Sequence, residues 1–404
     1  MNESIVSSLP TDLILVLNCG SSSIKFALFE AAVEPPRKPL WNGKVEGITG
    51  ASPTFGETGV APHAITLDAA LPYHAALTHI RERVVARLNG RHLRAVAHRV
   101  VHGGAKYSQP VRVNAAVLAD LKAYIPLAPL HQPFALEAIE ALLHSNPDLP
   151  QVACFDTAFH HSMPMVEQML PLPWNAWERG LRRYGFHGLS YEYMAQVLAE
   201  HHGDAARGKT LVAQLGSGAS LCAMQGLQSV ATTMGFSALD GLMMGTRCGS
   251  LDPGAVLYLM QIEGLNVDEV AQVLYRDSGL LGISGVSPDP RELLPLEQSN
   301  PRAAAAMAMY VRQIVREIGA LTAVLGGLDL LVFTAGIGEH NADVRARVCA
   351  GLGFLGIELD AAANTANAAV ISTAQSRVTV TVEPTNEEWI AARHACALMA
   401  SAVG

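Results

Sequence analysis

The chain has 404 residues, of which 50% are apolar and 16% are charged, enough apolar material for two or three domains with large cores. Lysine and arginine number 28 against 36 for aspartate and glutamate, so the net charge at pH 7 is −8. This acidic balance argues against nucleic acid or an anionic membrane surface as a partner of the whole chain. The six cysteines are scattered without a C-x-x-C pair, which predicts reduced core residues in a cytoplasmic protein rather than a disulfide or zinc framework.

Two segments bear on membrane association. The N-terminus has no basic region, and its apolar run at 13–17 is too short for a signal peptide. The segment 211–239 contains no charged residue, but Gly, Ser, Thr and Gln interrupt it repeatedly. That composition predicts two buried strands with turns rather than a membrane helix, so we expect no membrane partner.

The first half of the chain begins with two predicted strands, 13–17 and 24–29, joined by a Gly/Ser turn. Pro and Gly in 31–60 predict irregular or edge structure. The pattern then predicts a helix near 73–89, a strand at 95–101, a helix from Pro133 to 145 and a short buried strand at 151–155.

The second half of the chain repeats this alternation. We predict a helix at 190–201 and a strand–turn–strand unit at 211–224. These are followed by helices near 254–262, 267–276 and 301–326, a strand at 329–334, a turn at 335–339, a helix from 341, a strand near 377–382 and a closing helix. The segments VLNCGSSSIK (16–25) and VAQLGSGASL (212–221) share one pattern, which indicates an internal duplication. Two α/β domains facing each other across a cleft are therefore expected.

Two glycine motifs resemble phosphate-binding loops only in their letters. Residues 203–210 match G-x-x-x-x-G-K-[ST], but a helix precedes them and a strand follows, the reverse of the order that the P-loop mechanism needs. Gly336 and Gly338 follow a strand, but Asn341 stands where a dinucleotide fingerprint has its third glycine. We therefore expect a surface turn at the first motif, whereas the second motif is compatible with a phosphate or nucleotide near the helix start.

Polar residues end several of the apolar strands: Asn18, Arg99, Asp156, Gln214 and Glu339. Any one of them alone would be an ordinary turn or cap residue. Because α/β folds place their chemistry at strand ends, the five together predict a shared site.

Groups suited to anions accompany these strand ends. The turns at 20–23 and 216–218 offer backbone amides, and Lys25 follows the first of them. Arg99 and Arg247 lie among small residues, which favours bidentate capture of phosphate or carboxylate over a surface-loop role.

Two histidines lie in constrained loops, His131 between prolines and His187 in Tyr184-Gly-Phe-His-Gly188. A lone histidine is usually a satisfied core residue. The glycines around His187 weaken that interpretation and favour a functional role.

Several motifs, in order along nearly the whole chain, resemble the acetate and propionate kinases of the acetate and sugar kinase, Hsc70 and actin superfamily. The motifs are LNCGSSSIKF (17–26), HRVVHGG (98–104), APLHQP (128–133), FDTAFH (155–160), RRYGFHGLS (182–190), GLMMGTRCGSLDPG (241–254), SGLLGISGVSPDPR (278–291), FTAGIGE (333–339) and PTNEE (384–388).

This resemblance implies an α/β fold of two duplicated ribonuclease-H-like domains, as in actin-like ATPases. The first would comprise 1–157 plus 388–404, and the second, 158–387, would hold the nucleotide site and the dimer interface. The resemblance also implies a homodimer in the cytoplasm. The implied reaction is a reversible transfer of the γ-phosphoryl group from ATP, as co-substrate, to acetate, giving acetyl phosphate and ADP with Mg²⁺ or Mn²⁺.

The same resemblance assigns roles to residues of this chain. The implied metal positions are Asn18 and Glu387, and the implied catalytic positions are Arg99, His131, Asp156, His187 and Arg247. The implied acyl pocket, which Arg99 also borders, is formed by Val101, Leu130, Phe186 and Ala238. The implied nucleotide-binding residues are Lys25, Gln214, Leu215, Gly216, Ser217, Gly218, Asp289, Pro290, Arg291, Gly336, Ile337, Gly338, Glu339 and His340.

Elementary chemistry agrees with these roles. A carboxylic acid with a pKa of about 4–5 is already ionised at neutral pH and needs no base to become a nucleophile. The obstacle is repulsion between two anions, which arginines and a metal ion lower. We therefore expect Asp156 to orient substrate or metal rather than to remove a proton.

The chain departs from the family pattern at Gln214, Ser217 and His340, where His, Asn and Asn are usual, and at Ala238, where Pro is usual. The first three put the phosphoryl donor in question, and Ala238 opposes the tight pocket indicated by Val101. Propionate kinase, or acyl transfer from another donor, is the alternative. A sugar kinase and an actin-like nucleotide switch are more distant rivals.

Overall fold

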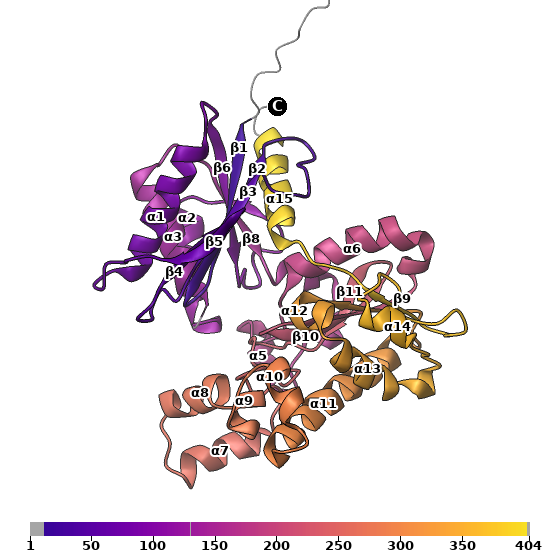
Figure 1. Ribbon diagram of the computed structural model, residues 1–404. Coiled ribbons are helices and arrows are strands. Elements are labelled where there is room, and N and C mark those ends of the chain that lie inside the picture. The colour runs from indigo at the N-terminus through magenta and orange to yellow at the C-terminus, as the bar shows by residue number, and fades with distance from the viewer. Residues whose placement is uncertain (1–11, 130, 402–404) are drawn as a thin grey trace, which may run out of the picture. The chain divides into compact units, whose positions relative to one another are not determined.

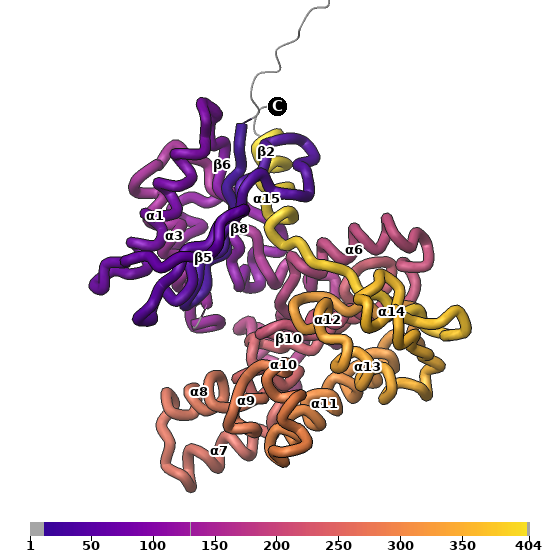
Figure 2. Tube along the Cα trace, in the orientation of Figure 1, coloured from indigo at the N-terminus to yellow at the C-terminus, as the bar shows by residue number. Residues whose placement is uncertain are grey.

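The computed structural model describes residues 12–129 and 131–401, which form two compact units. The chain passes from unit 1 to unit 2 after Ala158 and returns to unit 1 after Thr385. Each unit contains one sheet with helices packed against it (Figures 1 and 2). The α/β class with duplicated ribonuclease-H-like domains is thus confirmed.

Unit 1 is built on an 8-stranded sheet with the order β5-β4-β3-β2-β1-β6-β8-β7. β1 runs antiparallel to β2 and parallel to β6, which runs parallel to β8. The strands are β1 (Leu13–Cys19), β2 (Ser23–Glu30), β3 (Trp41–Glu46), β4 (Thr54–Glu57), β5 (Val60–Ala64), β6 (Leu93–Val100), β7 (Val111–Arg112) and β8 (Gln151–Phe155).

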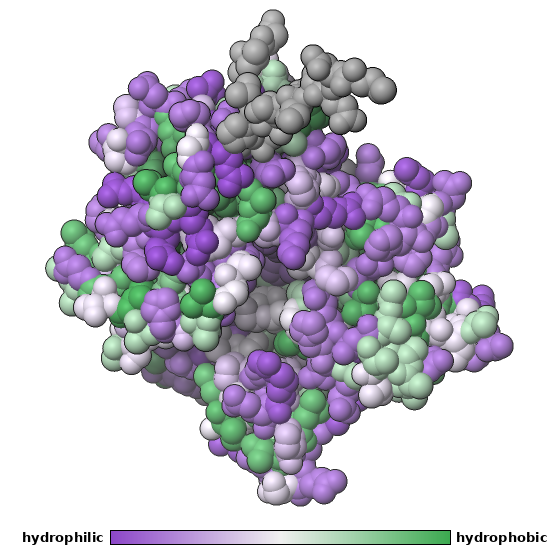
Figure 3. All heavy atoms as spheres, turned by 45° about the horizontal axis from the view of Figure 1, so that its top comes forward, coloured by the Kyte–Doolittle hydropathy of each residue, from purple (hydrophilic) through white to green (hydrophobic). Residues whose placement is uncertain are grey.

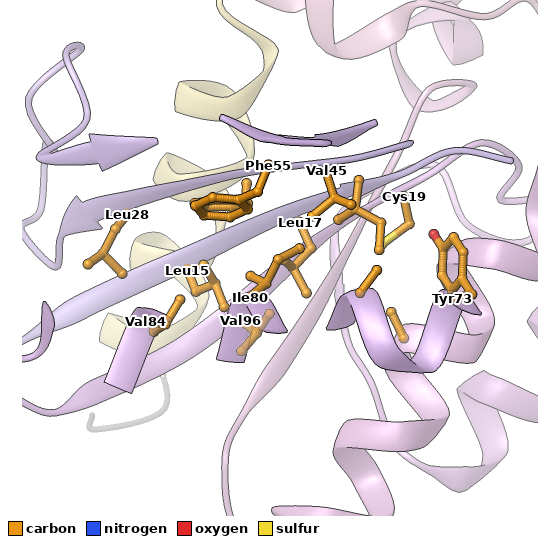
Figure 4. Packing of buried hydrophobic residues seen from close by; sticks show 14 of the residues in the cluster. Leu15, Leu17, Cys19, Leu28, Val45, Phe55, Tyr73, Ile80, Val84 and Val96 are labelled. Atoms are coloured by element: carbon orange, nitrogen blue, oxygen red, sulfur yellow. The ribbon is translucent and has the colours of Figure 1, made fainter. Parts of the chain in front are cut away.

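Helices cover both faces of this sheet. They are α1 (Pro72–Arg87), α2 (Ala115–Ala123), α3 (Gln132–Ser145) and the closing helix α15 (Glu387–Ser401). Because successive strand residues point to opposite faces, Leu15 and Leu17 of β1 pack with Ile80 and Val84 of α1 (Figure 4). The opposite face of β1, β6 and β8 contacts α15. This face also carries the polar strand ends.

Unit 2 has a 5-stranded sheet with the order β11-β10-β9-β12-β13. Its strands are β9 (Lys209–Leu215), β10 (Ala219–Gln225), β11 (Gln228–Thr232), β12 (Leu330–Thr334) and β13 (Thr379–Val382). Its helices are α4 (Met165–Gln168), α5 (Trp174–Glu178), α6 (Gly188–His202), α7 (Pro253–Gln261), α8 (Val267–Arg276), α9 (Gly279–Ser284), α10 (Pro290–Leu293), α11 (Pro301–Leu325), α12 (Ala335–His340), α13 (Ala342–Ala350) and α14 (Ala361–Thr365).

The two sheets repeat one strand pattern. β3-β2-β1-β6-β8 of unit 1 corresponds to β11-β10-β9-β12-β13 of unit 2. In each, an antiparallel three-strand meander continues into two parallel neighbours. The duplication predicted from 16–25 and 212–221 therefore extends to the whole central sheet.

Helix and strand starts follow local sequence signals. Asn300 accepts hydrogen bonds from the amides of Arg302 and Ala303 ahead of Pro301, as expected for the cap of α11. Asn266 forms a capping box with Glu269 at the start of α8.

Four local expectations differ from the structure. The region 31–60 holds regular strands, β3 and β4, with β5 beginning at its end, although β5 does lie at the sheet edge. Helix α2 was not anticipated. The segment 211–239 holds three strands, not two, and residues 335–339 form helix α12 rather than a turn. Each difference comes from tertiary pairing or from a short helix too brief for periodicity to reveal.

The P-loop look-alike lies between a helix and a strand, as predicted, but its residues Gly203–Arg207 form a short 3-10 helix rather than a turn. Gly203 ends α6, and Lys209 begins β9. The Lys209 Nζ atom donates to the carbonyl of Gly326, 2.6 Å away, so this lysine holds a neighbouring turn.

The surface seen in Figure 3 is mainly polar, with apolar atoms in separate patches. Over residues 12–129 and 131–401, no helix has both the length and the apolar character that a bilayer crossing requires.

His98 of β6 lies in the core of unit 1, where it is 1% exposed. Its Nε2 lies 2.8 Å from Gln151 Oε1, while Gln151 Nε2 donates to Ile139 O, so His98 carries its proton on Nε2. Burial lowers the pKa of His98 to about 4, with the Gln151 contact opposing that shift.

The pKa shift of His98 predicts an acid-sensitive unit 1. Below about pH 6.5 His98 is protonated in the unfolded chain, but in the folded chain it stays neutral down to about pH 4. The free energy of unfolding therefore decreases as the pH is lowered through this window. His98→Asn should reduce the stability lost between about pH 7.5 and about pH 5 by about 2 kcal/mol. Urea denaturation at both pH values measures this loss. The exposed His144→Asn is the control, and an unchanged loss in His98→Asn would contradict the assignment.

Candidate functional site

Strand register places three polar side chains of unit 1 in a row. Asn18 pairs with Lys25 across β1 and β2 and with Arg99 across β1 and β6. Residues opposite each other in register share a face, so all three lie on the face that α15 covers. Their neighbours Leu17 and His98 point into the other layer and are buried.

Arg99 is the centre of this group. Its Nε donates to Asp156 Oδ1 and Oδ2 at 2.9 and 3.1 Å, and its Nη2 donates to Oδ2 at 2.6 Å. Its Nη1 donates to Asn18 Oδ1 at 3.1 Å, and Glu387 Oε2 lies 3.5 Å from Nε. Since a guanidinium has five N–H donors, these hydrogen bonds leave two of them for a ligand.

The charges of this group are strongly coupled. Burial works against the charged guanidinium, but the carboxylates of Asp156 and Glu387 outweigh it and raise the pKa of Arg99. Burial likewise raises the pKa of Asp156, which Arg99 opposes. The pKa of Glu388 is raised by burial and by repulsion from Glu387. Arg99 therefore stays positively charged among the carboxyl groups of Asp156, Glu387 and Glu388.

Other predicted residues of unit 1 lie around this sheet. His131 is the N-cap residue of α3, and its amide donates to the carbonyl of Ala128 at 3.1 Å. Val101 is buried directly after β6, whereas Lys25 is exposed. Leu130 lies outside the described residues.

In unit 2, the turn between β9 and β10 is bordered by an imidazole and a guanidinium side chain. The Gly216 amide donates to Gly218 O at 3.1 Å, and Leu215 ends the strand before it. A Cβ at Gly218 would lie 3.2 Å from His187 Nε2 and 3.6 Å from Arg247 Nη1. Glycine therefore lets backbone, imidazole and guanidinium approach one another, as a phosphate site requires.

His187 has a strained backbone at φ 60°, ψ 26°, immediately before α6. Three contacts hold it there. The Phe186 carbonyl lies 2.9 Å from His160 Nε2, the His187 carbonyl accepts from the Tyr191 amide at 3.0 Å, and Nδ1 lies 2.8 Å from Ser220 Oγ. Non-glycine residues in this conformation cluster at functional sites. His160, which sequence reasoning did not select, thus helps to position His187.

A backbone carbonyl helps to orient Arg247. Its Nη1 donates to the Ala238 carbonyl at 2.9 Å and lies 3.4 Å from Met244 Sδ. The Ala238 carbonyl thus orients the guanidinium. Phe186 is buried, whereas Ala238 is partly exposed.

Gln214 joins a hydrogen-bonded chain at the end of β9. Its Oε1 accepts from Ser190 Oγ at 2.6 Å, and Ser190 Oγ lies 2.6 Å from Thr385 Oγ1. Ser217, at the tip of the turn, is exposed.

A fully buried arginine supports helix α12, which contains Gly336 and Ile337. Arg345 Nη1 donates to the carbonyls of Gly338 and Glu339 at 2.8 and 2.9 Å, and its other donors hold Asn364 and Asn367. An arginine within a short helix gives no sequence signal of such burial. The Glu339 carboxylate accepts from the Ala335 amide at 2.9 Å, whereas the side chain of His340 is 74% exposed.

Asp289 caps α10 and pairs with Arg291. Its Oδ1 accepts from the Arg291 amide at 2.8 Å, and Pro290 occupies the first turn. The Arg291 side chain is 81% exposed, so this pair contributes little stability.

The structure therefore brings the predicted residues together in two groups. Asn18, Arg99, Asp156 and Glu387 meet in unit 1, and Gly218, His187 and Arg247 meet in unit 2. The first group includes Asn18 near the end of β1, and the second includes Gly218 in the turn that follows β9, the corresponding strand of unit 2. Such paired sites on duplicated ribonuclease-H-like domains define the actin-like class of phosphotransferases and ATPases.

Comparison with known proteins gives the family. The chain matches the Acetokinase family over residues 13–393 and belongs to that family. It is 49% identical over 390 residues to an acetate kinase of Rhodopseudomonas palustris (95% of this chain, 98% of that protein). It is 47% identical over 397 residues to an acetate kinase of Rhizobium meliloti (96% and 99%).

Solved structures agree with this assignment. A propionate kinase from Francisella tularensis superposes with a TM-score of 0.88 at 34% identity, covering 95% of this chain and 99% of that one. An acetate kinase from Porphyromonas gingivalis gives 0.84 at 36% identity, covering 98% and 100%.

The Arg99–Asp156 contact predicts energetic coupling. Arg99→Met would leave a buried carboxyl group without its partner and should lower the free energy of unfolding by about 3 kcal/mol. In the double variant Arg99→Met/Asp156→Asn the unpaired charge is gone. Its loss should therefore fall short of the sum of the single losses by at least about 1 kcal/mol. Urea denaturation of the four proteins measures this difference, and additive losses would show that the pair is not coupled.

Proposed function

We propose that the chain is an acetate kinase that transfers the γ-phosphoryl group of ATP reversibly to acetate, giving acetyl phosphate and ADP. The observation that carries the proposal is the meeting of His187 Nε2 and Arg247 Nη1 at Gly218, a backbone turn with two donors suited to phosphate. The named relatives support the acyl acceptor.

The proposed reaction needs charge neutralisation more than proton transfer. Acetate is already ionised at neutral pH, so its approach to a phosphate is opposed by repulsion. Arg99, Arg247 and His187 would supply donors that stabilise the in-line transition state. Asp156 fixes the plane of the Arg99 guanidinium through three contacts and acts as a positioning residue rather than as a base. His131 completes the proposed catalytic set.

The proposed metal position is formed by Asn18 and Glu387. Both offer oxygen, the ligand type that Mg²⁺ and Mn²⁺ prefer, and Mg²⁺ usually takes one or two protein oxygens together with substrate phosphates. Within the described residues there is no group of three or more His, Cys, Asp or Glu side chains arranged for a metal. The ion would therefore take its remaining ligands from nucleotide and water. When bound, it would neutralise phosphate charge.

The proposed nucleotide contacts are Lys25 in unit 1 and the 214–218, 289–291 and 336–340 segments in unit 2. Arg345 fixes the last of these through two carbonyls. ATP is the proposed donor. Gln214, Ser217 and His340, which depart from the family pattern, all lie in these segments, and the rates with ATP and with other donors are therefore to be compared.

Propionate is the second candidate acceptor. Val101 favours a small acyl pocket, whereas Ala238 gives room for a methylene. One methylene in such a pocket is worth about 1–3 kcal/mol. We therefore propose overlapping use of acetate and propionate, with acetate preferred; Phe186 and Leu130 complete the proposed wall.

The proposal is tested by acyl phosphate formation, trapped as hydroxamate, from acetate, propionate and butyrate with ATP, GTP or pyrophosphate. Acetate-dependent ADP formation is expected. A sugar kinase would need a sugar acceptor, and a nucleotide switch would hydrolyse ATP slowly without acetate dependence. The absence of acyl phosphate from every short carboxylate would overturn the proposal.

Arg247→Ala should lower turnover in this assay by on the order of 10³-fold or more, because it removes a donor that acts mainly in the transition state. The exposed Arg316→Ala, on helix α11, is the matched control and should keep its activity. A loss of less than about tenfold in Arg247→Ala would remove Arg247 from the proposed mechanism.

We further propose a cytoplasmic homodimer. The six cysteines are unpaired, as in a reducing compartment. Helix α7 has no buried residue, and Leu257, Tyr258 and the following Ile262 are 54%, 54% and 68% exposed. An apolar patch of this kind on unit 2 suits a second copy of the chain.

Tyr258→Asp should turn the dimer into a monomer, because it places a charge in the proposed apolar interface. Light scattering during size-exclusion chromatography measures the mass. Val166→Asp, on the exposed α4, is the control and should leave the dimer intact. A monomeric wild-type protein would contradict the proposal.

A further inference from the structure

A buried chain of hydroxyl groups leads to His187. Tyr191 OH lies 2.6 Å from Ser220 Oγ, and Ser220 Oγ lies 2.8 Å from His187 Nδ1. Tyr191 and Ser220 are both 0% exposed. The other ring nitrogen, Nε2, is the one that faces Gly218.

The direction of these hydrogen bonds follows from counting protons. Ser220 has one hydroxyl proton for its two partners. If Ser220 donated to Tyr191, the Tyr191 hydroxyl proton would have no acceptor among the described residues. An unsatisfied buried donor is costly. Tyr191 therefore donates to Ser220, which donates to His187 Nδ1. Burial raises the pKa of Tyr191, so its donor proton is retained.

We infer that Tyr191 and Ser220 are positioning residues that hold His187 as a neutral imidazole with its proton on Nε2. This inference deepens the proposed function, on which its catalytic meaning rests. The groups facing His187 agree with it. Arg247 Nη1, a fixed positive charge, approaches the same point at Gly218, and the neutral His160 supports the loop through Phe186 O.

The tautomer decides what His187 offers to a phosphoryl group. With the proton on Nε2 the ring donates toward Gly218, where the transferred group would lie. With the proton on Nδ1 it would present a lone pair to an anion, which repels. The strained backbone of His187 and this hydroxyl chain thus have the same effect: both orient a neutral N–H donor toward the proposed phosphate position.

The test reads the tautomer directly. Histidine-labelled protein without substrate is examined by nitrogen NMR near neutral pH, and the His187 signals are assigned by their loss in His187→Gln. Wild type should show the proton on Nε2. Tyr191→Phe frees Ser220 to turn and should give mixed tautomers, and Ser220→Ala should do the same. Tyr310→Phe is the matched control, because it removes another buried hydroxyl far along the sequence on α11, and it should leave the signals unchanged.

Kinetics provide the second readout. Ser220→Ala should lower kcat by about 10-fold to 100-fold, less than deletion of a whole donor. Tyr191→Phe should move the acid limb of kcat/KM toward higher pH, because Ser220 Oγ can then accept a hydrogen bond from Nδ1–H of the imidazolium ring and stabilise the protonated form. A purely structural role would lower activity without moving this limb.

The outcomes separate the two proposals. A proton on Nδ1 or on both nitrogens in the wild type, or an unchanged tautomer in both Tyr191→Phe and Ser220→Ala, overturns the inference whatever the enzyme catalyses. A correct tautomer without acyl phosphate formation supports the hydroxyl chain and overturns the proposed reaction instead.

Discussion

The pairing of Arg99 with Asp156 determines much of what the rest of unit 1 does. A charged guanidinium can stay beside a carboxyl group in a buried place only when their geometry is fixed, and here three contacts of 2.6–3.1 Å fix it. The register of β1, β6 and β8 places Arg99 of β6 beside Asp156, which follows β8. Helix α15, near the other end of the chain, adds Glu387. The sheet is thus the scaffold for a fixed charge, consistent with chemistry limited by repulsion between anions.

In unit 2 the polar side chains of the site are held in place by different kinds of partner. Here uncharged groups orient the site side chains: the Ala238 carbonyl orients Arg247, Ser220 orients His187, and carbonyl and amide oxygens hold the buried Arg345. In unit 1, by contrast, Arg99 lies among carboxylates. The duplicated sheet therefore carries two electrostatically different sites at equivalent strand ends.

Strand ends, turn glycines and caps could be predicted from sequence because each depends on local chemistry. The hairpin around Gly20, the cap at Asn300 and the strand-end position of Asp156 are examples. The contacts of Arg345 with Asn364 and of His160 with Ser229 could not, since these partners lie 19 and 69 positions away and polar burial leaves no periodic signal. Strands β3 to β5 were missed for a similar reason: Pro and Gly reduce local propensity, but pairing along the edge of a sheet overrides it.

The return of the chain to unit 1 has a consequence for biosynthesis. Helix α15 covers one face of β1, β6 and β8, yet it is synthesised after every element of unit 2. Until α15 is synthesised, the nascent N-terminal unit lacks the helix that closes its layer, while unit 2 already has all of its strands. Completion of the first-made unit is thereby delayed until unit 2 has been synthesised, and a product truncated before α15 would carry an uncovered apolar sheet that attracts chaperones or proteases.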